Sequence, residues 1–298
     1  MRSVTLSLLA LATLTGCGSG SEVGTAASAS PSASAPTPSG STSPATSPSV
    51  VASPGAVPTT TTILERARAV YWIGAAADPR GPRLYREFVR RPDTSDPVQD
   101  AVEVMLAGEP KDPDYTSLWA DGTTVREVRR QGTTAVVDLS KQARTNGGGS
   151  AFEAATVQQL VYTVTAADPS LTAVRLLVEG EPVETLWGSV GTAEPLTRAA
   201  ALDVLGPVWL DVAEGGTIDS EFGCTASVFE ATVSWQLRQG DRALQEGFST
   251  ASTGAPGRGT WSATADVPPG DYELWAYESS AEDGSVTFLD TKRVSVRG

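Results

Sequence analysis

The side chains that could do chemistry in this chain are few in kind, because its 298 residues include no histidine and only two cysteines. Without imidazole, neither a Ser-His-Asp hydrolase nor a histidine-ligated zinc site can form. Lysine is almost as rare. None of Lys111, Lys141 and Lys292 follows a glycine as in a phosphate-binding loop, and none lies three residues after a serine. The chemistry left to consider belongs to a cysteine thiol, to clustered arginines and to carboxylates.

Cys17 has the most informative surroundings of these groups. A positively charged start and a short apolar run end in Leu14-Thr15-Gly16-Cys17, the layout of a secretory signal. That ending resembles the lipobox of bacterial lipoproteins, in which the chain is cut before the cysteine and the cysteine is acylated. Two or more acyl chains anchor a protein stably. The resemblance implies a signal peptide over 1–16, cleavage between Gly16 and Cys17, and lipid on Cys17; the alternative is an ordinary secreted protein.

Residues 17–62 are predicted to be a tether. After Cys17 nearly every residue is Ala, Ser, Thr, Pro or Gly, with one charge, at Glu22, and no aromatic. Such a segment cannot bury enough apolar surface to offset the entropy lost on ordering. As a coil it would hold a folded body about 35–40 Å from its anchor. If Cys17 carries lipid, Cys224 has no disulfide partner and is expected in a core.

Five arginines crowd one predicted strand region, relieved only by Glu87. Guanidinium groups bind carboxylates and phosphates, so a partner carboxylate, an anionic lipid or a wall polymer could dock there. An exposed edge strand guarded by charge explains the cluster equally well. The residues of this candidate interaction patch are Arg80, Arg83, Arg86, Arg90 and Arg91.

The carboxylates allow two further interpretations. Glycoside hydrolysis needs only two Asp or Glu side chains, which keeps a glycan hydrolase open as an alternative. Residues 191–298 carry 16 acidic and 7 basic side chains, a surplus that would suit Ca²⁺ or a cationic partner. No EF-hand spacing is present, and a solvated, self-repelling surface is the favoured explanation. We predict no metal and no cofactor.

The arginines and carboxylates must be positioned by secondary structure, and the first predicted domain covers residues 63–190. Apolar strands and two helices alternate there, and the helices carry single apolar stripes. The order β-β-α-β-β-α-β predicts an α+β fold, a mixed sheet with two helices on one face. The expected elements are strands at 69–73, 84–90, 125–130, 134–139 and 173–179, and helices that begin at Asp96-Pro97 and Ser150.

A second domain, over 200–298, is predicted to be an all-β sandwich. Short strands alternate in polarity between turn signals, the first with inward positions expected from Phe229 through Ala231 to Leu237. The last two strands are expected at 286–289 and 294–296. Five tryptophans would suit a sugar-stacking platform, but such residues more often fill a sandwich core. They are Trp187, Trp209, Trp235, Trp261 and Trp275.

Both domains resemble known families. The strings at 84–91, 101–108 and 135–140, followed by 159–164 and 174–180, are similar in order and spacing to the GerMN domain of spore-germination proteins and envelope lipoproteins. One departure is Gly108-Glu109-Pro110, where that family usually has Gly-Pro. The strings Phe229-Glu230-Ala231-Thr232-Val233 and Tyr277-Glu278-Ser279-Ser280 resemble the immunoglobulin-like domain found beside GerMN. The resemblance implies an extracytoplasmic scaffold with no catalytic residues.

These observations predict a lipid-anchored envelope protein that acts as a non-catalytic scaffold. Its expected place is the outer face of the cytoplasmic membrane, with envelope proteins or cell-wall material as partners. The formal net charge of −13 argues against a nucleic-acid partner. The excess of Arg over Lys is typical of a high-GC genome and fits an actinobacterial origin. The alternative function is a lipoprotein that binds or hydrolyses cell-wall glycan.

Overall fold

The computed structural model describes residues 65–74, 81–92, 96–145 and 148–297. All of them lie in one compact unit, residues 60–298. The predicted signal peptide over 1–16, the lipid site at Cys17, the tether over 17–62 and the arginine at position 80 lie outside the described residues.

The first domain contains two α-helices and two groups of strands. Its elements are β1 (Glu65–Gly74), β2 (Leu84–Pro92), α1 (Pro97–Ala107), β3 (Tyr115–Thr116), β4 (Val125–Gln131), β5 (Thr134–Leu139), the 3₁₀-helix η1 (Lys141–Arg144), α2 (Ser150–Ala167), β6 (Ala173–Val178), β7 (Glu181–Pro182) and β8 (Leu196–Thr197). None of the helices in the described part of the chain is both long and apolar enough to span a membrane.

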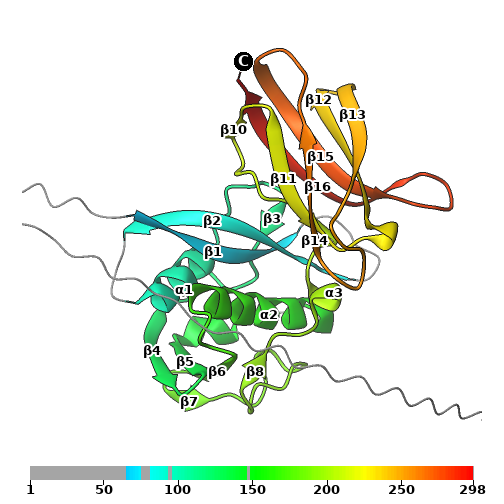
Figure 1. Cartoon of the computed structure of the whole chain (residues 1–298). Coiled ribbons are helices and arrows are strands. Elements are labelled where there is room, and N and C mark those ends of the chain that lie inside the picture. Colours follow the sequence, from blue (N-terminus) through cyan, green and yellow to red (C-terminus); the bar gives the residue numbers. More distant parts are fainter. Residues whose placement is uncertain (1–64, 75–80, 93–95, 146–147, 298) are drawn as a thin grey trace, which may run out of the picture. The chain divides into compact units, whose positions relative to one another are not determined.

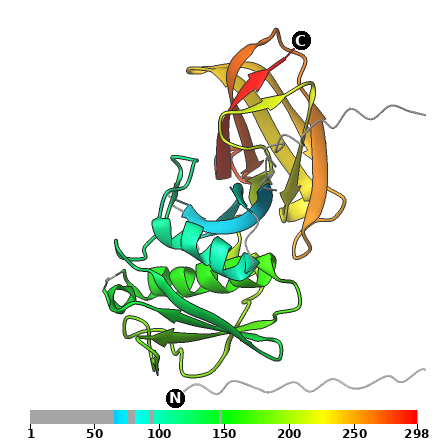
Figure 2. The same cartoon turned by 90° about the vertical axis from the view of Figure 1, so that its left-hand side faces the viewer.

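The predicted mixed sheet with both helices on one face is confirmed. Strand β5 pairs antiparallel with β4 and parallel with β6, and β7 and β8 complete this sheet. The first two strands do not join it, however. They form a separate sheet of order β2-β1-β3, so the helices lie between two sheets (Figures 1 and 2).

Helix α2 shows why a second sheet is needed. Besides the predicted apolar stripe, its polar residues Gln159 and Thr163 are also fully buried. The Gln159 amide donates to the Tyr71 carbonyl of β1 (2.9 Å), and the Tyr71 N–H donates to the Thr163 hydroxyl (3.1 Å). These bonds satisfy backbone groups of β1 where the short strand β3 does not reach. A helix buried on opposite sides cannot rest on one sheet alone.

Helix α1 begins and ends where the sequence predicts. The Asp96 carboxylate accepts the N–H groups of Val98 (2.9 Å) and Gln99 (3.3 Å), and Pro97 takes the first position. Gly108 ends the helix with φ 67°, ψ 23°, a left-handed conformation that glycine adopts without steric cost.

The second domain is a sandwich of two sheets, as predicted. Its elements are a short helix α3 (Ala201–Val204), β9 (Val208–Leu210), β10 (Gly216–Ile218), β11 (Glu221–Ala226), the 3₁₀-turn η2 (Phe229–Ala231), β12 (Thr232–Gln239), β13 (Arg242–Thr250), β14 (Gly259–Thr264), β15 (Gly270–Ser279) and β16 (Val286–Val296). The sheets have the orders β10-β16-β15-β12-β13 and β14-β11-β9.

Aromatic rings fill the sandwich core. Phe222 meets Trp235 and Trp261 edge-on, with ring centroids 5.4 and 6.1 Å apart, the arrangement that ring quadrupoles favour. The prediction that the tryptophans fill the sandwich core is confirmed for these two. Trp209 is also buried, but it belongs to the core of the first domain. Trp187 and Trp275 are only partly buried.

Two details of the strand prediction are wrong. Phe229 does not continue the inward row of β12, because it lies in η2 and its side chain is 70% exposed. The last two predicted strands are one continuous strand, β16, which contains an irregularity in its pairing with β15 between Thr287 and Asp290. Strand β13 was not predicted, because it is an edge strand without a fully buried face.

The polar contact between α2 and β1 can be tested by Gln159→Met, which keeps the side-chain volume but cannot donate to the Tyr71 carbonyl. We expect the free energy of unfolding to fall by about 1–3 kcal/mol, because a buried carbonyl loses its partner. Urea denaturation measures it. Gln99→Met on the exposed surface of α1 is the control and should change stability by less than about 0.5 kcal/mol. Equal losses in both variants would contradict this role of Gln159.

Candidate functional site at the joint of the two domains

Two arginines of the predicted patch lie at the joint between the domains instead of on open surface. Arg83 is buried and donates to the backbone carbonyls of Leu202 and Asp203 in α3. Arg86 forms an ion pair with Asp211, just after β9 (2.7 Å). Both guanidinium groups therefore hold the start of the second domain against β2.

Trp209 of β9 is the apolar centre of the joint. It is 4% exposed and packs into the core of the first domain together with Leu205. Its indole N–H donates to the Leu84 carbonyl of β2 (3.2 Å). The guanidinium carbons of Arg86 and Arg258 lie 5.1 and 4.4 Å from its ring, within cation–π range.

A buried charged cluster joins the domains beside Trp209. Lys292 of β16 pairs with Asp112, which precedes β3, and with Asp290 two residues before it on the same strand (3.4 Å). The lysine also donates to the Tyr115 hydroxyl (2.6 Å), which in turn donates to Asp290 (2.8 Å). Each of the four side chains comes from a residue less than one-tenth exposed. We call Asp112, Tyr115, Asp290 and Lys292 the joint cluster.

Neighbouring groups fix the joint cluster in place. The Glu87 carboxylate of β2 accepts the N–H groups of Asp112 (3.0 Å) and Lys111 (3.1 Å). The Tyr115 ring stacks on Tyr85 with centroids 5.2 Å apart. The Leu210 N–H of β9 donates to Asp290 (2.6 Å). Bonds to β2 and β9 thus fix the backbone of Asp112 and the carboxylate of Asp290.

Burial decides the protonation behaviour of the joint cluster. Loss of water raises the pKa of Asp290 to about 6, although the Lys292 charge and two hydrogen bonds oppose that rise. Burial likewise raises the pKa of Asp112. Burial alone would lower the pKa of Lys292, but the charges of Asp290 and Asp112 raise it. The lysine therefore stays charged between two carboxylates that ionise reluctantly.

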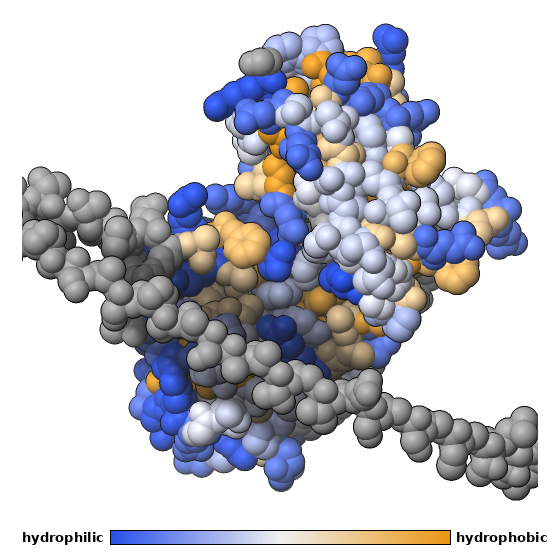
Figure 3. Space-filling model, viewed as in Figure 1, coloured by the Kyte–Doolittle hydropathy of each residue, from blue (hydrophilic) through white to orange (hydrophobic). Residues whose placement is uncertain are grey.

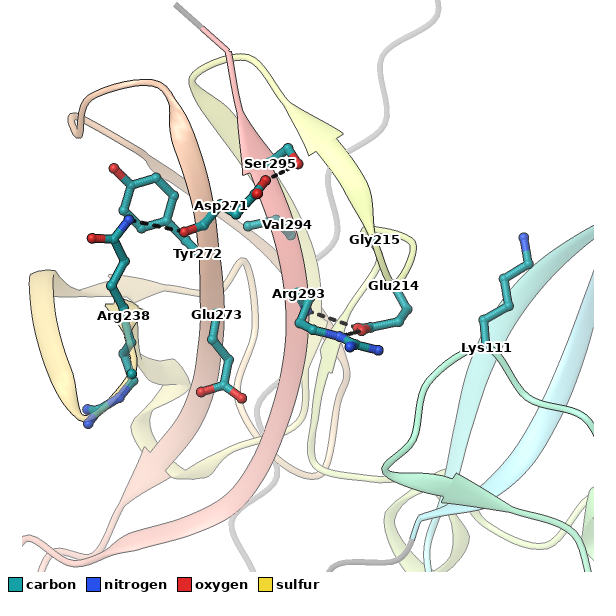
Figure 4. A pocket seen from close by; sticks show the side chains of 12 residues that line it. Lys111, Glu214, Gly215, Arg238, Asp271, Tyr272, Glu273, Arg293, Val294 and Ser295 are labelled. Carbon is teal, nitrogen blue, oxygen red and sulfur yellow. Dashed lines mark hydrogen bonds and ion pairs between the residues drawn. The ribbon is translucent and has the colours of Figure 1, made fainter.

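A hollow of about 1000 Å³ lies on the outer face of the sheet that contains β15 and β16 (Figure 4). Its acidic side chains are all engaged. Glu214 pairs with Arg293, Asp271 accepts from Ser295, and Glu273 accepts from the Trp275 indole. In the close view Lys111 stands apart from these groups. No two free carboxylates face each other across this hollow, as a two-carboxylate hydrolase would need.

A smaller hollow of about 380 Å³ opens beside the joint cluster and is lined by Tyr85, Tyr115, Glu273 and Asp290, among others. Within the described ranges, no three Cys, Asp or Glu side chains are grouped so that they could hold a metal ion. The Cys224 side chain lies outside what the structure describes.

The remaining described arginines of the patch do lie on the surface. Arg90 and Arg91 are exposed. Phe88, which lies between Arg86 and Arg90 on the same strand, is 48% exposed. Figure 3 shows apolar atoms over β2 among hydrophilic neighbours. The structure thus divides the predicted patch into two joint residues and two surface residues.

Sequence reasoning missed the joint cluster, although one signal was available. Alternate residues of a strand point to the same side of the sheet. Asp290 and Lys292 therefore point to the same side of β16 as Val294 and Val296, which are both buried. A lysine in a core-facing position requires a carboxylate partner. The partner from the first domain, Asp112, could not be identified from that pattern.

Lys292→Met tests the ion pair. It leaves the carboxylates of Asp112 and Asp290 buried without a counter-charge, and we expect the free energy of unfolding to fall by about 3–5 kcal/mol. Adding Asp112→Asn and Asp290→Asn should recover most of that loss. Lys141→Met, at an exposed lysine, is the control. Similar destabilisation by both lysine substitutions would contradict the assignment.

The pKa of Asp290 predicts a pH dependence. It is about 6 in the folded protein against an ordinary 3.8, so its stabilising contribution is complete below pH 3.8 and is lost as pH rises through 6. The quantity to compare is the difference in free energy of unfolding between the unsubstituted protein and Asp290→Asn. We expect this difference, unsubstituted minus substituted, to fall by up to about 3 kcal/mol between pH 4 and pH 7. Urea titrations at each pH measure this difference, and a difference that rises with pH would refute the prediction.

Solved structures similar to this chain include proteins from two bacteria. The first GerMN domain of the sporulation protein GerM from Bacillus subtilis is 21% identical over 47% of this chain and 96% of that one, with a TM-score of 0.36. A lipoprotein structure from Clostridium perfringens is 19% identical over 46% of this chain and 89% of that one, with a TM-score of 0.33.

The tandem GerMN domains of GerM are 18% identical over 62% of this chain, with a TM-score of 0.39, and this chain spans 59% of their length. No curated protein matches the chain. Family models do match both domains. The sporulation and spore germination family, Germane, covers residues 69–184, and the immunoglobulin-like domain of bacterial spore germination, Gmad2, covers residues 211–285. The chain therefore contains a Germane domain followed by a Gmad2 domain.

Proposed function

We propose that this chain is a non-catalytic interaction protein of the cell envelope, held at the outer face of the cytoplasmic membrane by lipid on Cys17. The observation that supports it best is the joint. Two domains of spore-germination type are locked through a buried charged cluster whose groups are all satisfied within the chain. Such a joint presents two fixed surfaces to a partner, as a scaffold requires.

The proposed anchor is supported by the sequence. A secretory signal that ends in Leu-Thr-Gly-Cys is followed by a tether without apolar clusters, and acylation of Cys17 would give this signal a stable attachment. The tether over 17–62 would then let the folded domains reach partners beyond the membrane surface.

The proposed lack of catalysis is supported by the bonding of the carboxylates. In the hollow beside β15 and β16 each acidic side chain has a partner from its own domain, and no histidine exists to act as a base. The alternative, a lipoprotein that binds or hydrolyses cell-wall glycan, draws on one observation: Phe248 of edge strand β13 is 75% exposed, and sugars stack on such rings.

Cys17→Ala tests the anchor. We expect the substituted protein to leave the membrane fraction and appear in the medium or the soluble extracytoplasmic fraction, because it has lost its acylation site. Cys224→Ala, which removes the other thiol, is the matched control and should stay with the membrane. Cell fractionation with immunoblotting and incorporation of a clickable fatty acid measure both. Retention of Cys17→Ala in the membrane would refute the lipid anchor.

Crosslinking in living cells, followed by mass spectrometry, tests the scaffold. Reproducible capture of one envelope protein complex is expected. Recovery of wall glycan fragments alone would favour the alternative function, and hydrolysis of purified wall glycan would then be the next assay.

A further inference from the structure

The outer edge of β2 offers backbone groups that the described chain uses only at its first position. Strand β2 is the last strand in the sheet β2-β1-β3. The Leu84 carbonyl accepts the Gly206 N–H (2.9 Å), so this carbonyl points away from β1. Groups on alternate residues of an antiparallel strand point to the same side. The N–H and C=O groups of Arg86, Phe88 and Arg90 therefore point outward as well.

The bonding of β1 supports the same assignment. Tyr71 lies opposite Arg86 in the register of the two strands, yet its N–H and C=O bond to α2 instead of β2. The pair is thus one that exchanges no backbone hydrogen bonds, and the Arg86 groups must also face away from β1. Among the described residues, no backbone partner meets the outward groups of Arg86, Phe88 or Arg90.

We propose that this open edge, the outward backbone groups of Arg86, Phe88 and Arg90, binds an extended acidic segment of an envelope protein as a fourth strand of the sheet β2-β1-β3. When a strand is added in this way, main-chain hydrogen bonds provide the affinity and alternate side chains provide the specificity. The inference rests on the proposed function and names the chemistry of its partner.

The positive charge at one end of this edge favours an acidic partner. Arg90 and Arg91 are exposed, and neither forms an ion pair with another described residue. The Arg86 charge is already met by Asp211. Carboxylates on an added strand would therefore find two free guanidinium groups at one end of the edge. A second copy of this chain would instead bring its own arginines against these, so it is a poor occupant.

Two further observations favour pairing. Phe88 is 48% exposed on the same strand face as Arg86 and Arg90. Its ring offers an apolar contact to the residue that lies opposite it on an added strand. The chain itself already bridges to the first edge position, where Leu205 pairs in parallel with Leu84. An added segment would continue an interface that exists. The competing explanation, that arginines guard the edge against pairing, predicts no binding.

The probe is an eight-residue peptide of alternating glutamate and valine, acetylated, amidated and fluorescently labelled, mixed with the full chain in mild detergent. Anisotropy measures the Kd, and amide exchange by NMR locates the contact. We expect at least about tenfold slower exchange at the Arg86, Phe88 and Arg90 amides, with no change at Glu87 and Val89, which already bond within the sheet. The same peptide N-methylated at alternate residues should bind at least tenfold more weakly.

Substitutions separate the backbone from the side chains. Phe88→Ala and Phe88→Pro both remove the ring, but only proline removes the outward N–H, so Phe88→Pro should weaken binding at least tenfold beyond Phe88→Ala. Circular dichroism checks that both variants fold. Combined Arg90→Glu and Arg91→Glu should abolish binding, whereas Arg242→Glu, on the exposed edge strand β13, should not.

Three results would overturn the proposal: no binding at millimolar peptide, binding without slower exchange at the three amides, or equal affinities of Phe88→Pro and Phe88→Ala. The proposed function would survive any of them if Cys17→Ala still releases the protein and crosslinks still capture an envelope complex. If Cys17→Ala stays in the membrane and no envelope complex is captured while the peptide binds the open edge, the proposed function is refuted and the edge assignment is supported.

Discussion

A lysine ammonium removed from water between two carboxylates holds the domains of this protein in register. Lys292 and Asp290 come from the sandwich, and Asp112 comes from the Germane domain. Isolated charges at such depth would be very costly. A buried pair adds little net stability compared with apolar residues, but breaking it is expensive. The cluster therefore acts mainly through orientation, because a displaced joint would leave one of its charges unpaired.

The arrangement of β2 depends on that joint. With the sandwich held by Trp209 and the joint cluster, Arg83 and Arg86 are occupied by groups of the second domain. The chain crosses to the sandwich at the first edge position of β2, and no described backbone group pairs with the later positions of that edge. The same joint that immobilises Arg83 and Arg86 thus leaves Arg90 and Arg91 exposed.

Local features were predictable because their causes are local. The start of α1 at Asp96-Pro97 and its end at Gly108 follow from capping chemistry within a few residues, and both are observed. The alternation of Val233, Trp235 and Leu237 identified the inward face of β12. The separate sheet of β1 and β2 was not predictable in this way. It depends on Gln159 and Thr163, whose burial on the second side of α2 has no signature in an apolar stripe.

The sequence by itself determined the two domains, their order and their families, because composition, capping and periodicity are properties of neighbouring residues. It could not decide which arginines are free. Arg83 and Arg90 look alike in the sequence, yet one is buried against α3 and the other is exposed. Only the tertiary structure brings Asp112 to Lys292, 180 residues away, because which charges meet depends on how two cores pack together.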